Sequence, residues 1–224
     1  MSDTKPTIAV LGGTGHEGAG LAARWAKAGF PVVIGSRDAA RAAEAATAMA
    51  DRTGGTVSGN DNASAAAAGE IVVLAVPYAG QQALAKDVQA HLDGKILIDV
   101  TVPLVPPKVA RVQLPEGGSA VEALQKMLGE NVRVVAAFQN VSAHQLADLD
   151  AEVNCDVLVT GDDVDARETV VQLAKAIGVT ALHAGPLANS AAAEALTSVL
   201  ISINKRYKVA DGAGIRITGI PAGA

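Results

Sequence analysis

Cysteine, aromatic residues and histidine are all scarce in this chain of 224 residues. Cys155 is the single cysteine, so an intrachain disulfide is excluded, and this usage is typical of a reducing cytoplasm. One Trp, two Tyr and two Phe are too few for the stacking surfaces that bind single-stranded nucleic acid. The four histidines form no His-x-x-x-His pair, and neither Cys-x-x-Cys nor a Ser-His-Asp order occurs, so metal and hydrolase sites have no support.

Positive charge and long apolar runs are also in short supply. Lys and Arg number 18 against 23 Asp and Glu, and the net charge of −5 argues against nucleic acid or an anionic membrane as the main partner. The longest apolar segment, residues 191–203, is interrupted by Glu194 and Thr197 and falls short of the ~20 apolar residues that span a bilayer. The short polar start of the chain has no signal-peptide character. We therefore expect a soluble, cytoplasmic protein that binds neither nucleic acid nor membrane.

Hydrophobic residues make up 50% of the chain, in short β-branched runs that alternate with alanine-rich segments of helical length. This alternation predicts βαβ units around a parallel sheet with helices on both faces. The expected strands are residues 7–11, 32–35, 56–58, 71–76, 95–100 and 132–138. The expected helices between them are residues 18–28, 39–52, 63–68, 81–91 and 120–128.

The second half of the chain continues the same pattern after a loop. Residues 101–118 hold four of the nine prolines and are predicted to be that loop. Strands at 156–160 and 180–183 and helices at 164–177 and 189–209 follow, with no clean linker before them. We therefore expect an α/β protein with a Rossmann-type, doubly wound and mostly parallel sheet in residues 1–141. A small C-terminal α/β extension, residues 142–224, should pack on it.

A glycine-rich segment directly follows the first expected strand. Its glycines fit the pattern G-x-G-x-x-G, in which the first allows a tight turn, the second lets the backbone approach a pyrophosphate, and the third allows close packing of helix on strand. The helix N-terminus then offers free N–H groups to the anion. This context favours a dinucleotide-binding loop over a merely structural glycine turn. The residues of the expected loop are Gly13, Thr14, Gly15, His16, Glu17 and Gly18.

The end of the second expected strand indicates which dinucleotide binds. An NAD site would have Asp or Glu there for the ribose hydroxyl, whereas this chain has Ser36 and Arg37, with Arg41 one helical turn on. Arg37 can pair with a 2′-phosphate and stack on adenine, Ser36 can donate a hydrogen bond, and Arg41 adds positive charge. Asp38 is either the ribose acid or the N-cap of the next helix, and the flanking arginines favour the cap. The sequence therefore predicts NADP(H) as the cofactor.

No protein acid–base constellation is evident. The Tyr-x-x-x-Lys pair of short-chain dehydrogenases is missing, since neither Tyr78 nor Tyr207 has a lysine four residues on. Hydride exchange between two bound organic cofactors needs proximity and orientation more than a protein nucleophile. The absence therefore favours a reaction of this kind and leaves the catalytic residues unassigned.

Several segments resemble the family of NADPH-dependent coenzyme F420 reductases (F420H2:NADP oxidoreductases). They are Leu-Gly-Gly-Thr-Gly (11–15), Gly-Ser-Arg (35–37), Val-Pro (76–77), Pro-Leu-Val-Pro (103–106), Ser-Ala-Val-Glu-Ala (119–123), Val-Ala-Ala-Phe (135–138), Gly-Asp-Asp (161–163) and Ala-Gly-Pro-Leu (184–187). The resemblance implies a homodimer that transfers a hydride between nicotinamide C4 and deazaflavin C5. By motif, it places the pyrophosphate on residues 14–17, the 2′-phosphate on Ser36, Arg37 and Arg41, and the nicotinamide beside Val76, Pro77 and Tyr78.

The acceptor side is expected directly after the sixth strand. The family often has a histidine there, and this chain has Gln139, which can donate a hydrogen bond but cannot carry a proton or a charge. The residues expected to bind the acceptor are Gln139, Asn140, Val141 and His144, and loop capping is the alternative role of Asn140 and His144. An NADPH-dependent reductase of a flavin, imine or small carbonyl compound, and a non-enzymatic NADP(H)-responsive binding protein, are the alternative functions.

The last expected helix, residues 189–209, has an apolar face that could take part in a subunit interface. Leu196, Val199, Leu200 and Ile203 stand at helical spacing, and an apolar tail follows them. Packing within the chain and a homodimer interface both account for this pattern, and the family resemblance favours the homodimer.

Overall fold

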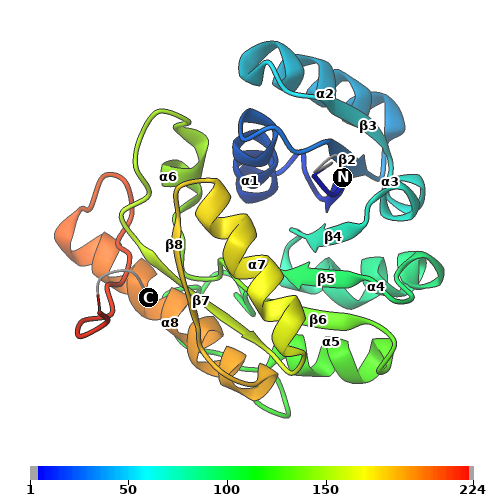
Figure 1. The fold of residues 1–224 in the computed structure, drawn as a ribbon. Helices are drawn as coiled ribbons and strands as arrows, with labels where there is room; N and C mark the ends of the chain where they lie inside the picture. The colour runs from blue at the N-terminus through cyan, green and yellow to red at the C-terminus, as the bar shows by residue number, and fades with distance from the viewer. Residues whose placement is uncertain (1–4, 222–224) are drawn as a thin grey trace.

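Residues 5–221 are described by the computed structural model, and within them eight strands form one sheet in the order β3-β2-β1-β4-β5-β6-β7-β8 (Figure 1). The strands are β1 (Ile8–Leu11), β2 (Val32–Ser36), β3 (Val57–Asp61), β4 (Ile71–Leu74), β5 (Ile96–Asp99), β6 (Arg133–Ala136), β7 (Asp156–Gly161) and β8 (Thr180–His183). The helices are α1 (His16–Lys27), α2 (Ala39–Thr53), α3 (Asn62–Ala68), α4 (Tyr78–Val88), α5 (Ala120–Leu128), α6 (Ala143–Ala147), α7 (Val164–Ala176) and α8 (Ser190–Tyr207), with 3-10 turns η1 (Gln89–His91) and η2 (Leu187–Asn189).

The first six strands are parallel and follow the doubly wound order, in which the winding changes direction between β1 and β4. β7 pairs antiparallel with β6, and β8 pairs parallel with β7. The predicted fold class, a Rossmann-type and mostly parallel sheet with a C-terminal α/β extension, is confirmed. Because β6 and β7 are paired, the sheet is continuous across residues 141 and 142, and the division into two domains there stays a prediction.

Helices cover both faces of the sheet because the side chains of each buried strand alternate between two apolar clusters. On β1, Ile8 and Val10 pack with α1, α2 and α7, whereas Ala9 and Leu11 pack with α3, α4 and α5. All four side chains are fully buried. This two-sided burial is the reason that the strands are apolar throughout rather than alternating.

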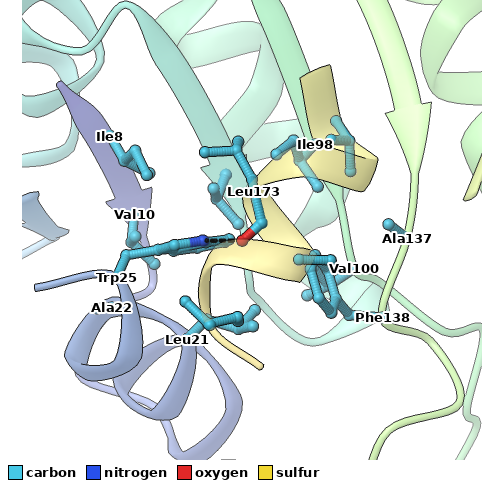
Figure 2. Packing of buried hydrophobic residues seen from close by; sticks show 14 of the residues in the cluster. Ile8, Val10, Leu21, Ala22, Trp25, Ile98, Val100, Ala137, Phe138 and Leu173 are labelled. Atoms are coloured by element: carbon cyan, nitrogen blue, oxygen red, sulfur yellow. Dashed lines mark hydrogen bonds between the residues drawn. The ribbon is translucent and has the colours of Figure 1, made fainter. Parts of the chain in front are cut away.

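Trp25 connects the N-terminal and C-terminal parts of the core (Figure 2). Its ring meets Phe138 edge-on, with the ring centroids 6.0 Å apart, and its indole N–H donates to the carbonyl oxygen of Leu173 at 3.1 Å. The three residues belong to α1, the segment after β6, and α7. The helix that begins at the glycine-rich loop therefore shares one core with the C-terminal extension.

The edge strand β3 is longer than the sequence predicts. The expected strand ends at Ser58, because residues 59–61 read Gly-Asn-Asp and are weak strand formers. In the structure they stay paired with β2 up to Ser36 and Asp61. A Cβ at Gly59 would lie 2.1 Å from the carbonyl oxygen of Ala42 in α2, so the glycine is what lets α2 pack closely on this strand.

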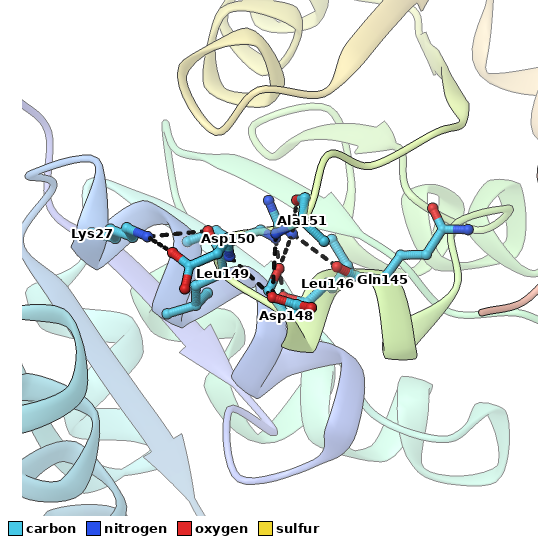
Figure 3. A network of polar contacts seen from close by, with 8 residues as sticks. Lys27, Gln145, Leu146, Asp148, Leu149, Asp150 and Ala151 are labelled. Carbon is cyan, nitrogen blue, oxygen red and sulfur yellow. Dashed lines mark hydrogen bonds and ion pairs between the residues drawn. The ribbon is translucent and has the colours of Figure 1, made fainter. Parts of the chain in front are cut away.

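A second difference is α6, a five-residue helix that is missing from the helices expected from the sequence. Arg24 of α1 is 7% exposed and holds this segment through backbone carbonyl groups, whose residues are labelled in Figure 3. Its guanidinium donates, at 2.5–3.0 Å, to the carbonyl oxygens of Gln145, Leu146, Asp148 and Ala151. The segment thus depends on a side chain more than 100 positions away, which the local sequence pattern does not reveal.

The end of the chain returns along β7. The carbonyl oxygen of Ile215 accepts from the backbone N–H of Asp156 at 2.8 Å, and Arg216 forms an ion pair with the Asp156 carboxylate at 2.8 Å. Asp156 is buried, so these contacts hold residues 215–217 against the start of β7. Among residues 5–221, none of the helices is both long enough and apolar enough to cross a membrane.

Candidate dinucleotide site

Residues 12–18, the phosphate loop, turn sharply from β1 into α1. The turn is made at Gly12, whose φ is +81° and whose N–H donates to the carbonyl oxygen of Gly35 at 3.0 Å. Gly15 is the N-cap of α1 and has no side chain to cap it, so N–H groups of the first helical turn are left for another acceptor. A glycine-rich turn that ends at an open helix N-terminus suits an anionic phosphate group.

Close backbone packing requires several of the loop glycines. A Cβ at Gly12 would lie 2.3 Å from the carbonyl oxygen of Ala75, and a Cβ at Gly18 would lie 2.7 Å from the carbonyl oxygen of Gly12. The role predicted for the third glycine of the motif, close packing of helix and strand, therefore agrees with the geometry. The left-handed residue is Gly12, one position before the first glycine of the motif. In the sequence, the Gly-Gly pair at 12–13 is the feature that could have indicated a left-handed residue at position 12.

A cavity of about 510 Å³ opens beside the phosphate loop, where the sheet changes its winding direction. It lies beyond the carboxyl ends of β1, β2 and β4, the edge at which doubly wound sheets bind ligands. Of the residues predicted to bind the cofactor, those that line it are Thr14, Gly15, Ser36, Arg37, Arg41, Val76 and Pro77. Sequence segments about 60 residues apart therefore meet in one site, as the dinucleotide prediction requires.

The end of the cavity beyond β2 is positively charged. Arg37 and Arg41 are exposed there, and neither forms an ion pair with any other residue in the part of the chain that the structure describes. Asp38 Oδ1 accepts from the backbone N–H groups of Ala40 at 2.9 Å and Arg41 at 3.2 Å. The interpretation of Asp38 as the N-cap of α2 is confirmed, and both guanidinium groups are available to an anion.

The opposite end of the cavity lies beyond β4 and next to β5. Val76 and Pro77 line it, and Tyr78 begins α4 just outside the lining. Behind them lies the fully buried carboxyl group of Asp99, the last residue of β5. It accepts from the Thr101 N–H at 2.9 Å and from the side-chain amide of Gln81. Burial raises the pKa of Asp99 to about 6, although these hydrogen bonds favour the charged form.

The predicted acceptor residues do not all face one space. Gln139 and Asn140 are 3% and 2% exposed. The Gln139 amide donates to the carbonyl oxygen of Asp99 at 2.8 Å, and that of Asn140 donates to the carbonyl oxygen of Asp156 at 2.8 Å. Both side chains therefore fix the turn after β6 instead of pointing into an open space.

Phe138 sets the direction of this turn. Its φ is +71°, a left-handed conformation that is rare for a bulky residue, and its side chain is fully buried. Val141 is also buried, whereas His144 is exposed on α6. His144 lines a separate cavity of about 540 Å³ with the returning tail. The structure therefore separates His144 from the other predicted acceptor residues.

Two further carboxyl groups lie near Asp99. Glu17 of the phosphate loop is half-buried, and burial, followed by the charge of Asp99, raises its pKa to about 8. Glu194 of α8 is 1% exposed and accepts from the Ser119 hydroxyl at 2.7 Å and from the Ala120 N–H at 2.8 Å. It thereby caps α5, and its burial raises its pKa. Within residues 5–221, no group of His, Cys, Asp and Glu side chains is placed to hold a metal ion.

Sequence reasoning assigned no role to Asp99, Gln81 or Glu194. Asp99 did carry a signal, because it is the only charged residue in the apolar run Ile-Leu-Ile-Asp-Val at 96–100. Gln81 and Glu194 had no such signal in the sequence, because polar residues are common in amphipathic helices. Their partners lie 18 and more than 70 residues away, so only the fold reveals them.

Comparison with known proteins places these features in a family. The family model described as "NADP oxidoreductase coenzyme F420-dependent" matches residues 7–103. The F420-dependent NADP reductase of Methanothermobacter thermautotrophicus is 41% identical over 222 residues, which cover 96% of this chain and 95% of that protein. That of Methanocaldococcus jannaschii is also 41% identical, over 95% of this chain and 98% of the other. A provisionally assigned F420-dependent NADP reductase of Arthrobacter sp. FB24 has a similar structure, with a TM-score of 0.77, 28% identity and coverage of 91% and 96%.

Proposed function

This chain belongs to the family of coenzyme F420-dependent NADP oxidoreductases, and we propose that it transfers a hydride between NADP(H) and the deazaflavin of coenzyme F420. The observation that carries the proposal is the cavity at the switch point of the sheet. Three features follow one another along this cavity: two arginines without ion-pair partners among residues 5–221, the phosphate loop, and the Val76–Pro77 turn. This is the order in which a dinucleotide would place its 2′-phosphate, its pyrophosphate and its nicotinamide.

Each part of the dinucleotide has residues of matching chemistry. The first-turn N–H groups of α1, with Thr14, Gly15 and His16, would hold the pyrophosphate. Ser36, Arg37 and Arg41 would hold the 2′-phosphate, because a guanidinium pairs with a phosphate through two parallel hydrogen bonds. Val76, Pro77 and Tyr78 would border the nicotinamide, which supplies or receives the hydride at C4 when bound.

The acceptor is proposed to lie beside the turn after β6, against Gln139, Asn140 and Val141, whereas His144 lines a separate cavity and has no place in this proposal. Because the Gln139 and Asn140 side chains are bonded to backbone groups of β5 and β7, they would act by fixing the shape of this wall. A polar backbone group of the turn would then meet the edge of the deazaflavin at which charge develops. The protein would accelerate the reaction by orienting two rings and excluding water, with no nucleophile of its own.

The test of the proposal is stopped-flow measurement of the loss of F420 absorbance on mixing with NADPH. We expect turnover with NADPH and much weaker activity with NADH. Gln139→Leu should slow the hydride transfer and leave the dissociation constant of NADPH unchanged. Tight binding of NADPH without any turnover of F420 would show that the acceptor is another compound.

We also propose that the protein is a homodimer. The apolar side chains that α8 and the tail leave exposed are Val199, Ile203, Tyr207, Val209, Ile217 and Ile220. They supply the kind of surface that a second copy would cover. Light scattering of a homogeneous monomer at micromolar concentration would contradict the dimer. A cytoplasmic location is part of the proposal and is supported by the single, buried Cys155.

A further inference from the structure

The end of β5 lies between the two turns that would border the reacting rings. In the sheet β5 stands between β4 and β6, and its last residue, Asp99, pairs with Leu74 on one side and with Ala136 on the other. Neighbouring strands are about 4.8 Å apart, so the turn after β4, at residues 76–77, and the turn after β6, at residues 138–141, are about 10 Å apart. A residue at the end of β5 that is bonded to both turns therefore sets their spacing.

Asp99 is bonded to the turn after β6 through its main chain. Its carbonyl oxygen accepts from the side-chain amide of Gln139 at 2.8 Å and from the N–H of Ala137 at 3.3 Å. Gln139 is 3% exposed and Asp99 is fully buried, so water does not compete for these bonds. The turn after β6 is thus tied to the end of β5.

The side chain of Asp99 is bonded toward the turn after β4. Its carboxyl group accepts from the side-chain amide of Gln81 in α4, the helix that begins directly after residues 76–77. It also accepts from the N–H of Thr101 at 2.9 Å, and the Thr101 hydroxyl donates to the carbonyl oxygen of Val76 at 3.4 Å. Gln81 is fully buried and Thr101 is 2% exposed. Two routes therefore connect Asp99 with the wall of the cavity at Val76.

The carboxyl group of Asp99 is costly where it lies, because burial disfavours its charged form. Within residues 5–221 it has no ion-pair partner. Burial raises the pKa of Asp99 to about 6, so at pH 8 the group is ionised and can only accept hydrogen bonds. It offers two acceptor oxygens at one point, and these receive donors from α4 and from the loop after β5. An apolar side chain at this position would join neither.

A second glutamine network has a different place in the fold. Gln125 of α5 donates to the carbonyl oxygens of Gly129 and Val132 at 2.7 and 3.0 Å. Its Oε1 atom accepts from the Val134 N–H at 3.1 Å. These bonds lie at the start of β6, whereas the cavity lies beyond the carboxyl ends of the strands. Gln125 therefore provides the same kind of side chain in a network that reaches neither turn.

We infer that Asp99 is a positioning residue for the hydride transfer, which holds the turn beside the nicotinamide and the turn beside the acceptor at a fixed spacing. The inference rests on the proposed function for the identity of the two rings. Asp99 does not line the cavity, so it acts through the residues of the two turns. A displacement of about 1 Å between reacting groups can cost about a hundredfold in rate, so a fixed spacing matters for catalysis.

The first experiment breaks the link at Gln81, which does not line the cavity. Gln81→Met has a side chain of similar length and removes the donor to Asp99. The rate constant of hydride transfer from NADPH to F420 is measured in a single turnover at pH 8 and normalised to bound NADPH. We expect it to fall about tenfold to a hundredfold. The dissociation constant of NADPH should change by less than about twofold, because the phosphate loop and Arg37 are left intact.

Gln125→Met is the matched control, since it is the same substitution in the network at the start of β6. It should lower the thermal midpoint and leave the rate constant of hydride transfer unchanged. An unchanged rate constant in Gln81→Met would overturn the inference. An equal loss of rate in both variants would also overturn it, because the effect would then follow from lost stability alone.

A reciprocal exchange tests the bond itself. Asp99→Ala removes the acceptor and should be at least as slow as Gln81→Met. In the double variant Asp99→Asn with Gln81→Glu, the amide at position 99 can donate to the carboxylate at position 81, and the Thr101 N–H keeps an acceptor. This variant should regain most of the wild-type rate. A double variant that binds NADPH normally but stays as slow as Asp99→Ala would overturn the inference.

The fluorescence of bound NADPH tests the inference without any acceptor. In the wild type and in Gln125→Met, the anisotropy of the nicotinamide emission should decay with the rotation of the whole protein. In Gln81→Met a faster decay should appear, because the turn at residues 76–77 is held less firmly. Identical decays in all three proteins would overturn the inference. Absence of F420 turnover by the wild type would contradict the proposed function, and this comparison would then still decide the role of Asp99.

Discussion

The phosphate loop and the C-terminal extension are held in place by different means. The loop depends on backbone groups that lie close together because glycines leave room for them, as at Gly12 and Gly18. The extension depends on a few polar side chains that reach backbone groups far away in the sequence. Arg24 binds the segment around α6, Glu194 caps α5, and Asp156 binds the tail.

This difference indicates which kind of substitution destabilises each region. In the loop, an added methyl group is the harmful change, because the contacts are between backbone atoms. In the extension, loss of one side chain is the harmful change, because several buried carbonyl groups lose their donor together. We therefore expect the loop to be destabilised by the addition of a single methyl group, and the extension to be destabilised by the loss of a single polar side chain.

The largest effect is expected at Arg24. Arg24→Leu keeps the apolar packing of α1 but removes the donors to four carbonyl oxygens, so we expect a loss of about 4 kcal/mol in the free energy of unfolding. Urea denaturation measures the change. Lys27→Ala is the matched control, since Lys27 binds Leu149 and Asp150 at the exposed surface and its loss should leave stability unchanged within error. Equal effects of the two substitutions would contradict the role of Arg24.

A slightly smaller loss is expected from the smallest possible substitution in the loop. Gly12→Ala places a methyl group 2.3 Å from the Ala75 carbonyl oxygen in a left-handed conformation, so about 3 kcal/mol of stability should be lost, together with NADPH affinity. Gly80→Ala is the control, because a Cβ there meets no atom within 4 Å and Gly80 is helical. It should raise the thermal midpoint slightly. An unchanged midpoint for Gly12→Ala would show that the loop can move.

Cofactor choice tests the charged end of the cavity. Arg37→Asp removes a charge-assisted contact and adds repulsion, so NADPH binding should weaken by about 2–4 kcal/mol while NADH binding stays similar or improves. Lys126→Asp makes the same change in net charge on α5 and serves as the control. Titration of both nucleotides measures the effect. Equal affinity of the wild type for NADH and NADPH would refute the assignment of Arg37 to the 2′-phosphate.

The same contrast explains what the sequence could predict. The strand and helix pattern and the G-x-G-x-x-G motif are local, so the fold class, the family and the position of the phosphate loop followed from short segments. Gly59 in β3 and the helix α6 were missed, since each is stabilised by tertiary contacts that outweigh weak local propensity. The orientation of Gln139 was not predictable either, because its bond to Asp99 depends on the pairing of β5 with β6.

The smallest effect concerns the pH dependence of stability in the cofactor-free protein. The pKa values of Glu17 and Asp99 are raised to about 8 and about 6, so between pH 5 and 8 the folded state binds more protons than the unfolded state. Stability should therefore fall as the pH rises through this range. Converting the whole pKa shift of Glu17 into free energy of unfolding would overstate its contribution, because the side chain is only half-buried. We therefore expect a contribution on the order of 2 kcal/mol to the free energy of unfolding. Urea denaturation at pH 5, 6, 7 and 8 should thus show a shallower fall for Glu17→Gln than for the wild type or the exposed control Glu130→Gln. Parallel curves for all three proteins would mean that Glu17 keeps its ordinary pKa in the folded state.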